Sequence, residues 1–122
     1  MQTIVLIEDD FMLRSMYESK LRKGGYEVLA AGDGATGLTH IQSRKPELVV
    51  MDVMFPKFDG FKILQIIKEQ EDTKHIHVVF LTNLAQDEDI EKGKSLGASG
   101  YLIKSEVTPK ELLEWVNKVL EN

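Results

Sequence analysis

The sequence predicts an α/β fold in which a five-stranded parallel sheet is covered by helices on both faces. Two observations lead to this prediction. Along the 122 residues, short apolar runs alternate five times with segments of helical spacing, as in a parallel sheet joined by right-handed crossovers. Three of the runs are apolar without alternation, which is expected of strands that are buried on both faces.

The five predicted strands are Ile4–Ile7, Tyr26–Ala31, Leu48–Met51, Ile76–Leu81 and Tyr101–Ile103. The first, third and fourth contain the uninterrupted apolar runs. Ligands of such sheets bind beyond the C-terminal ends of the strands. The residues that follow each run are therefore the candidate functional residues.

Apolar stripes define the first three predicted helices: Leu13, Met16, Tyr17 and Leu21; then Ala35, Leu38 and Ile41; then Ile63, Leu64, Ile66 and Ile67. Gly24 and Gly25 give the first helix a stop signal. The second helix follows Asp33, and Asp59 can cap the third.

The last two helices are predicted from their end signals. The segment Gln86–Leu96 has acidic residues in its first turn, but Gly93 lies inside it at a cost of about 1 kcal/mol relative to alanine. The fifth helix begins with the capping box Thr108–Glu111, which has proline at the first helical position. We expect residues 1–122 to form a single domain.

Composition excludes several classes of function. A net charge of −5 argues against direct binding to nucleic acid, because phosphate contacts require a clustered basic face. The absence of cysteine excludes disulfides and thiolate metal sites. No apolar run approaches the roughly 20 residues of a membrane helix, and the first residues do not form a secretion signal. We therefore expect a cytoplasmic protein without membrane contact.

Charged and hydroxyl side chains occur where the predicted strands end. Glu8, Asp9 and Asp10 follow the first strand, Asp52 the third, Thr82 and Asn83 the fourth, and Lys104 the fifth. Carboxylates placed this close repel one another unless a cation intervenes. Oxygen ligands without histidine or cysteine favour a hard ion, Mg²⁺ above all if phosphate is involved. A lysine and a hydroxyl nearby suit the transfer of a phosphoryl group to an aspartate.

The same residues carry a family resemblance over essentially the whole chain. Glu8-Asp9, the run Asp52 to Gly60 with Pro56 and Asp59-Gly60, Leu81-Thr82, and Tyr101 to Lys104 together resemble the motifs of response-regulator receiver domains. The resemblance implies a flavodoxin-like, doubly wound sheet of order 2-1-3-4-5. It also implies a phosphoacceptor switch and not a conventional enzyme, although the switch catalyses its own phosphorylation and dephosphorylation.

The resemblance assigns roles to individual residues. Asp52 would accept a phosphoryl group from a sensor histidine kinase, a histidine phosphotransfer protein or a small phosphodonor. Asp9, Asp52 and the backbone carbonyl of Met54 would hold Mg²⁺, and Glu8 would act mostly through a metal-bound water. Thr82 and Lys104 would contact the phosphoryl group.

Thr82 and Tyr101 would switch the face that binds a downstream target, with the chain a monomer or a phosphorylation-dependent dimer. For Tyr101, plain packing on an edge strand remains the other interpretation.

Two residues depart from the family pattern. Asn83 stands where a small residue is usual, and its side chain could crowd the phosphoryl site or hydrogen-bond to it. Ser105 stands where proline is usual. Because a cis bond before serine costs roughly 2.5–4 kcal/mol, we predict a trans Lys104–Ser105 bond.

Three other functions compete with the receiver interpretation. A phosphotransferase of the haloacid-dehalogenase type would have Asp-x-Asp, whereas Met54 occupies the second position. A flavodoxin-like cofactor binder would have a phosphate-cradling loop after the first strand, where this chain has three acids. A degenerate receiver that acts as a phosphorylation-independent docking module remains open, because of Asn83 and Ser105.

Overall fold

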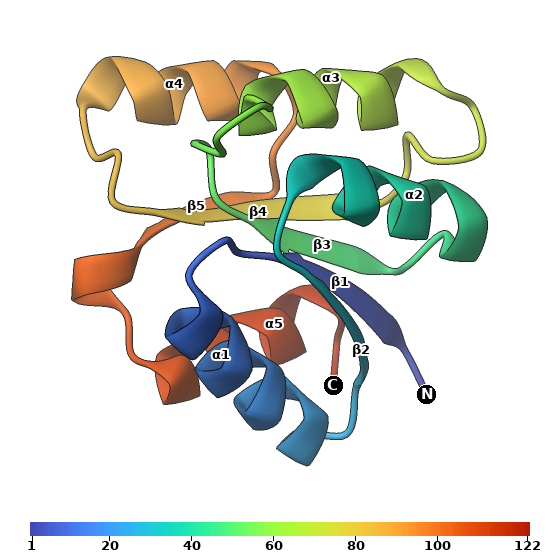
Figure 1. Cartoon of the computed structure of the whole chain (residues 1–122), viewed down its shortest axis with the longest axis vertical. Helices are drawn as coiled ribbons and strands as arrows, with labels where there is room; N and C mark the ends of the chain where they lie inside the picture. The colour runs from blue at the N-terminus through green and yellow to red at the C-terminus, as the bar shows by residue number, and fades with distance from the viewer.

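The computed structural model describes residues 1–122 and has the predicted architecture, a parallel sheet between two layers of helices (Figure 1). The strands are β1 (Thr3–Ile7), β2 (Glu27–Ala31), β3 (Leu48–Met51), β4 (His77–Thr82) and β5 (Gly100–Ile103). Their order is β2-β1-β3-β4-β5, which confirms the topology that the family resemblance implied.

The helices are α1 (Phe11–Lys23), α2 (Gly34–Arg44), α3 (Gly60–Glu69), α4 (Asp87–Ser95) and α5 (Pro109–Val119), and a short 3₁₀ helix, η1 (Lys104–Glu106), precedes α5. Helices α1 and α5 cover one face of the sheet, and α2, α3 and α4 cover the other (Figure 1). None of the helices has the length and apolar composition of a membrane-spanning segment.

The strands with uninterrupted apolar runs, β1, β3 and β4, lie in the middle of the sheet. They contribute side chains to two hydrophobic cores, one on each face. In β1, Val5 and Ile7 join the core under α2 and α3, whereas Ile4 and Leu6 join the core under α1 and α5. Residues of β3 alternate in the same way. Alternation of side chains along a strand therefore explains why these runs contain no polar position.

Several predicted boundaries shift by one residue for identifiable reasons. Thr82 is the last residue of β4 and does not follow it, because it pairs with Ile103 of β5. Tyr26 lies outside β2, where its N–H donates to the Leu21 carbonyl at the end of α1. Ile76 precedes β4, with its N–H donating to the Thr73 carbonyl in a turn.

The predicted helix ends are largely confirmed. Asp59 accepts a hydrogen bond from Phe61 N at 2.8 Å and caps α3, and both bonds of the Thr108–Glu111 capping box are present. The predicted stripe of α1 is partly wrong. Tyr17 and Leu21 are buried, but Met16 is 42% exposed, because it lies at the margin of the packed face.

Register brings the C-terminal ends of the strands to one edge of the sheet. Ile7 pairs with Met51, Met51 with Phe80, and Phe80 with Tyr101. The residues that follow these paired positions therefore meet at the same edge, which is where ligands of such sheets bind.

Candidate functional site

Three carboxylates converge at this edge. Glu8 and Asp9 follow β1, and Asp52 follows β3, which is the strand next to it. One carboxylate oxygen from each of the three residues lies within 4.8 Å of the others. The structure thus brings together the acidic residues that were selected from the sequence, in a cluster of hard oxygen donors of the kind that suits Mg²⁺.

Lys104 inserts its ammonium group between two of these carboxylates. Its Nζ lies 2.6 Å from Glu8 Oε1 and 2.7 Å from Asp52 Oδ2. Burial alone would lower the pKa of Lys104, but the hydrogen bonds and charges of the two carboxylates outweigh it, and the pKa is raised. The ammonium group therefore keeps its charge in a site that is largely shielded from water.

Backbone donors fix the carboxylates of Glu8 and Asp52. Glu8 Oε2 accepts from Asp10 N at 3.0 Å, and Asp52 Oδ1 accepts from Met54 N at 3.2 Å. Burial raises the pKa of Glu8, and the contact with Lys104 opposes that shift. Asp9 differs from both: it is exposed, and none of the hydrogen bonds in the structure engages its carboxylate.

Thr82 and Tyr101 are connected through one backbone unit, that of Leu84. Thr82 Oγ1 accepts from Leu84 N at 3.2 Å, and the Tyr101 hydroxyl donates to Leu84 O at 2.6 Å. This arrangement leaves the Thr82 hydroxyl proton available as a donor. Sequence reasoning did not single out Leu84, because an apolar residue in a loop gives no signal for a role that its backbone performs.

The Tyr101 ring is partly buried and packs against the aromatic residues of the core under α3 and α4. It is tilted against Phe80 with ring centres 5.8 Å apart, and Phe80 in turn meets Phe61 edge to face at 5.3 Å. Burial raises the pKa of Tyr101 to about 12, with smaller contributions from Asp89 and Asp52. Gly93 of α4 faces the same ring: a Cβ at that position would lie 3.1 Å from Tyr101 Cδ2.

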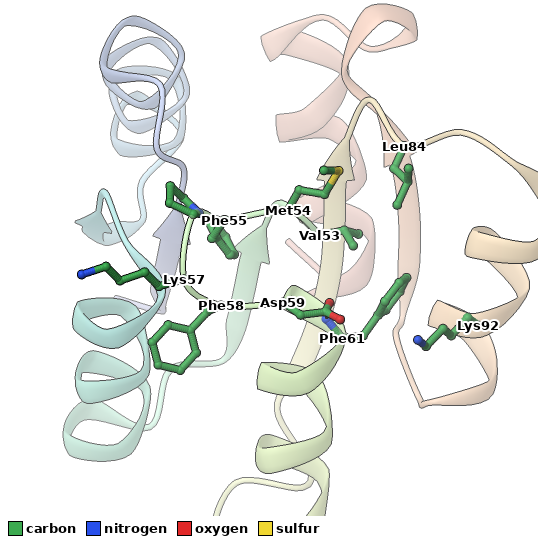
Figure 2. Close-up of a pocket in the computed structure, with 10 residues that line it drawn as sticks. Val53, Met54, Phe55, Lys57, Phe58, Asp59, Phe61, Leu84 and Lys92 are labelled. Atoms are coloured by element: carbon green, nitrogen blue, oxygen red, sulfur yellow. The ribbon is translucent and has the colours of Figure 1, made fainter.

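A hollow of about 450 Å³ adjoins the site on the side of α3 and α4 (Figure 2). Its walls include Met54 from the loop after β3, Phe61 from α3, Leu84 from the segment after β4, and Lys92 from α4. The Lys92 ammonium lies 4.8 Å from the centre of the Phe61 ring, which is a cation–π distance. Neither the wall nor this contact was expected from the sequence.

The two departures from the family pattern both lie on the surface. Asn83 is exposed, and its side chain makes no hydrogen bond within the chain. Ser105 is exposed in η1. The Lys104–Ser105 bond is trans, which confirms the prediction, and Lys104 reaches Asp52 with this geometry.

Comparison with known proteins agrees with the fold. Residues 4–117 match the model of the response regulator receiver domain family. A probable transcriptional regulator, ycf27, of Cyanophora paradoxa is 38% identical over 117 residues, which is 96% of this chain and 47% of that protein. The transcriptional regulator RpaA of Synechocystis is 36% identical over 104 residues, 85% of this chain and 43% of that protein. The chain thus spans about half the length of these curated relatives.

Solved structures show the same likeness. The chemotaxis protein CheY4 of Vibrio cholerae superposes with a TM-score of 0.90 at 29% identity, covering 98% of each chain. The BeF₃-activated DrrB receiver domain gives a TM-score of 0.89 at 31% identity, covering 100% of this chain and 99% of that one. Because the family model, the sequence relatives and the solved structures agree, the chain belongs to the response regulator receiver domain family.

Proposed function

We propose that the chain works as a phosphorelay switch in which Asp52 accepts a phosphoryl group from a sensor histidine kinase or a histidine phosphotransfer protein. Receiver domains are phosphoacceptor switches of two-component systems. The observation that carries the proposal for this chain is the Lys104 ammonium group 2.7 Å from Asp52 Oδ2, with the Glu8 and Asp9 carboxylates alongside. A fixed carboxylate with a fixed cation beside it provides both a nucleophile and charge stabilisation.

The proposed transfer forms one bond and breaks one. An oxygen of Asp52 bonds to phosphorus as the phosphorus–nitrogen bond of the phosphohistidine breaks, and the imidazole leaves with the electron pair. Lys104 balances charge on the phosphoryl oxygens, and the Thr82 hydroxyl donates to one of them.

Receiver domains bind Mg²⁺ at an acidic pocket, and such a cluster is present here. Asp9, Asp52 and the Met54 carbonyl would hold the ion, with Glu8 contributing through a water, and the ion would neutralise phosphoryl charge. The exposed position of Asp9, the buried position of Asp52 and their purely oxygen donors fit such an ion.

The shared contacts at Leu84 provide the proposed route from the site to a partner. A phosphoryl group that draws Thr82 toward it would alter the bond from Leu84 N, and Tyr101 holds the carbonyl of the same residue. The output would be a changed surface on α4, β5 and α5, read by a downstream target. The curated relatives are named as transcriptional regulators and are about twice as long, so DNA binding would belong to a part outside these residues.

Intact-mass measurement tests the proposal. Incubation with acetyl phosphate and Mg²⁺ should add one phosphoryl group to the chain, and Asp52→Asn should take up none. Equal labelling of the two proteins would contradict the assignment of Asp52. No labelling of either, with a kinase or with acetyl phosphate, would favour the degenerate docking module.

A further inference from the structure

Glu8 is the most completely fixed acidic residue of the site. Its N–H donates to Ala31 O at 3.0 Å, and its carbonyl accepts from Arg14 Nη1 at 2.8 Å. Both oxygens of its carboxylate are also engaged, one by Asp10 N at 3.0 Å and the other by Lys104 Nζ at 2.6 Å. The residue is 2% exposed, so it has little freedom to adopt another rotamer.

The contact with Lys104 spans most of the sheet. Lys104 follows β5, and β4 and β3 lie between that strand and β1. Neighbouring strands are about 4.8 Å apart, so the ends of β1 and β5 are separated by roughly three such spacings. The ammonium group of Lys104 contacts both Asp52, after β3, and Glu8, after β1. A glutamate, which is one methylene longer than an aspartate, extends the reach from β1 toward this group.

We propose that Glu8 is a positioning residue for Lys104: its carboxylate holds the ammonium group beside Asp52, so that the lysine is already in place when the phosphoryl group arrives. This inference rests on the proposed function and assigns Glu8 a task that differs from that of Asp9. Asp9 is exposed and open to a metal, whereas the Glu8 carboxylate is occupied on both oxygens.

If Asp52 were its only partner, the flexible side chain of Lys104 could rotate about its own bonds and carry the ammonium group away from that carboxylate. The second partner, Glu8, removes that freedom before the reaction begins, and pre-organised charge is the most effective kind in a phosphoryl transfer. The effect of Glu8 on the reaction should therefore depend on the presence of Lys104.

A double-mutant cycle on the phosphorylation rate tests this dependence. Initial rates with acetyl phosphate and saturating Mg²⁺ are compared for the unaltered chain, Glu8→Gln, Lys104→Met and the double variant. Glu8→Gln should slow the reaction about tenfold when Lys104 is present and less than about twofold when it is replaced. Equal losses in the two backgrounds would show that Glu8 acts through the metal or another group, and would overturn the inference.

Glu8→Asp is the matched variant, because it keeps the charge and the oxygen chemistry but shortens the reach. It should be about as slow as Glu8→Gln. Recovery of the full rate with aspartate would mean that charge suffices and reach does not matter, which would also overturn the inference.

Urea unfolding without metal or phosphodonor provides a second test of the Glu8–Lys104 contact that does not depend on the phosphorylation reaction. Lys104→Met leaves Glu8 and Asp52 facing each other, so it should lower the urea midpoint. In a Glu8→Gln background that shift should fall to about half or less. In an Asp9→Asn background, which removes the same charge without touching Lys104, the shift should stay close to its original size.

If Lys104→Met shifts the urea midpoint equally in the Glu8→Gln background and in the unaltered chain, Glu8 and Lys104 do not interact and the inference is wrong. If Lys104→Met fails to fold, Lys104→Gln keeps a polar group between the carboxylates and serves the same comparison. If the unaltered chain takes up no phosphoryl group, the proposed function fails while the urea cycle still decides the Glu8–Lys104 pairing.

Discussion

Single side chains in this site differ in what they are free to do. Asp9 and Asp10 are adjacent and have the same chemistry, yet Asp10 uses its carboxylate to accept from Leu13 N at 3.0 Å and cap α1. Asp9 has no such bond and takes part in the carboxylate cluster. The environment of each residue, more than its type, therefore separates a structural acid from a candidate ligand.

This difference predicts how Mg²⁺ affects stability. An ion that binds only the folded chain raises the melting temperature as its concentration increases. Asp9→Asn should remove most of that rise, because it deletes an open ligand. Asp10→Asn is the matched control and should keep it, since asparagine is as good an N-cap as aspartate. A melting temperature that does not respond to millimolar Mg²⁺ in the unaltered chain would contradict a metal site here.

Tyr101 provides a prediction in alkaline solution. Burial raises its pKa from the ordinary value of 10.0 to about 12, so the folded chain holds this proton more tightly than the unfolded chain does. Stability linked to Tyr101 is thus fully present below about pH 10 and is lost as the pH rises toward 12. The absorbance of tyrosinate should show a late-titrating tyrosine that Tyr101→Phe removes. A titration curve unchanged by that substitution would show that Tyr101 is not the late group.

At the scale of helices and strands, α4 is the α-helix with the fewest buried residues. Its single buried residue is Gly93. On sequence grounds this glycine only weakens the helix, whereas the structure gives it a purpose. A Cβ there would lie 3.1 Å from Tyr101 Cδ2 and 3.4 Å from Phe80 Cδ2. The missing side chain lets α4 approach the aromatic residues of β4 and β5.

Gly93→Ala should therefore destabilise the chain, although alanine is the better helix former by about 1 kcal/mol. Overpacking against the Tyr101 ring costs typically 1–3 kcal/mol, so a net loss of about 1 kcal/mol is expected. The measurement is urea unfolding, with Glu91→Ala on the exposed side of the same helix as a control of small effect. A gain in stability at position 93 would show that the rings yield freely to α4.

The elements themselves were predictable because their signals are local. Uninterrupted apolar runs located β1, β3 and β4, and the Thr108–Glu111 capping box located the start of α5. The segment Gln86–Leu96 was predicted as a helix, and its two end residues are the caps of α4. The spacing argument is wrong for Met16, because spacing alone does not show how wide an apolar stripe the neighbouring elements cover.

For the candidate site, the sequence predicts which residues take part but not which contacts they make. The acids and Lys104 could be selected because they directly follow apolar runs that end at one edge. The bridge from Lys104 to Glu8 and the pair of bonds to Leu84 could not be selected, since both depend on how far a side chain reaches across other strands. Sequence order fixes which strand end a residue occupies, but the contact at that end depends on tertiary packing.

At the scale of the whole molecule, the site and α4 share one face of the sheet through a continuous set of contacts. Thr82 and Tyr101 meet at Leu84, Tyr101 packs on Phe80, and Gly93 of α4 lies over both rings. Helices α1 and α5 lie on the opposite face and join none of these contacts (Figure 1). The route that leaves the site through the Thr82 hydroxyl therefore leads to α4, whereas α1 contacts the site only at its N-terminal end, where Asp10 N and Arg14 donate to Glu8.

A beryllofluoride-type mimic of the phosphoryl group should make this asymmetry measurable. A mimic bound at Asp52 presents acceptor atoms to the Thr82 hydroxyl, and a bond there competes with the one that Thr82 accepts from Leu84 N. We expect amide hydrogen exchange to change in α4 and around Leu84 and Tyr101, with little change in the middle of α1. Thr82→Ala should abolish the response in α4 while mimic binding, held by Lys104 and the metal, persists. Thr82→Ser is the matched control, because it keeps the hydroxyl and should retain the response. An α4 response that survives in Thr82→Ala would mean that the signal leaves the site by a route other than Leu84.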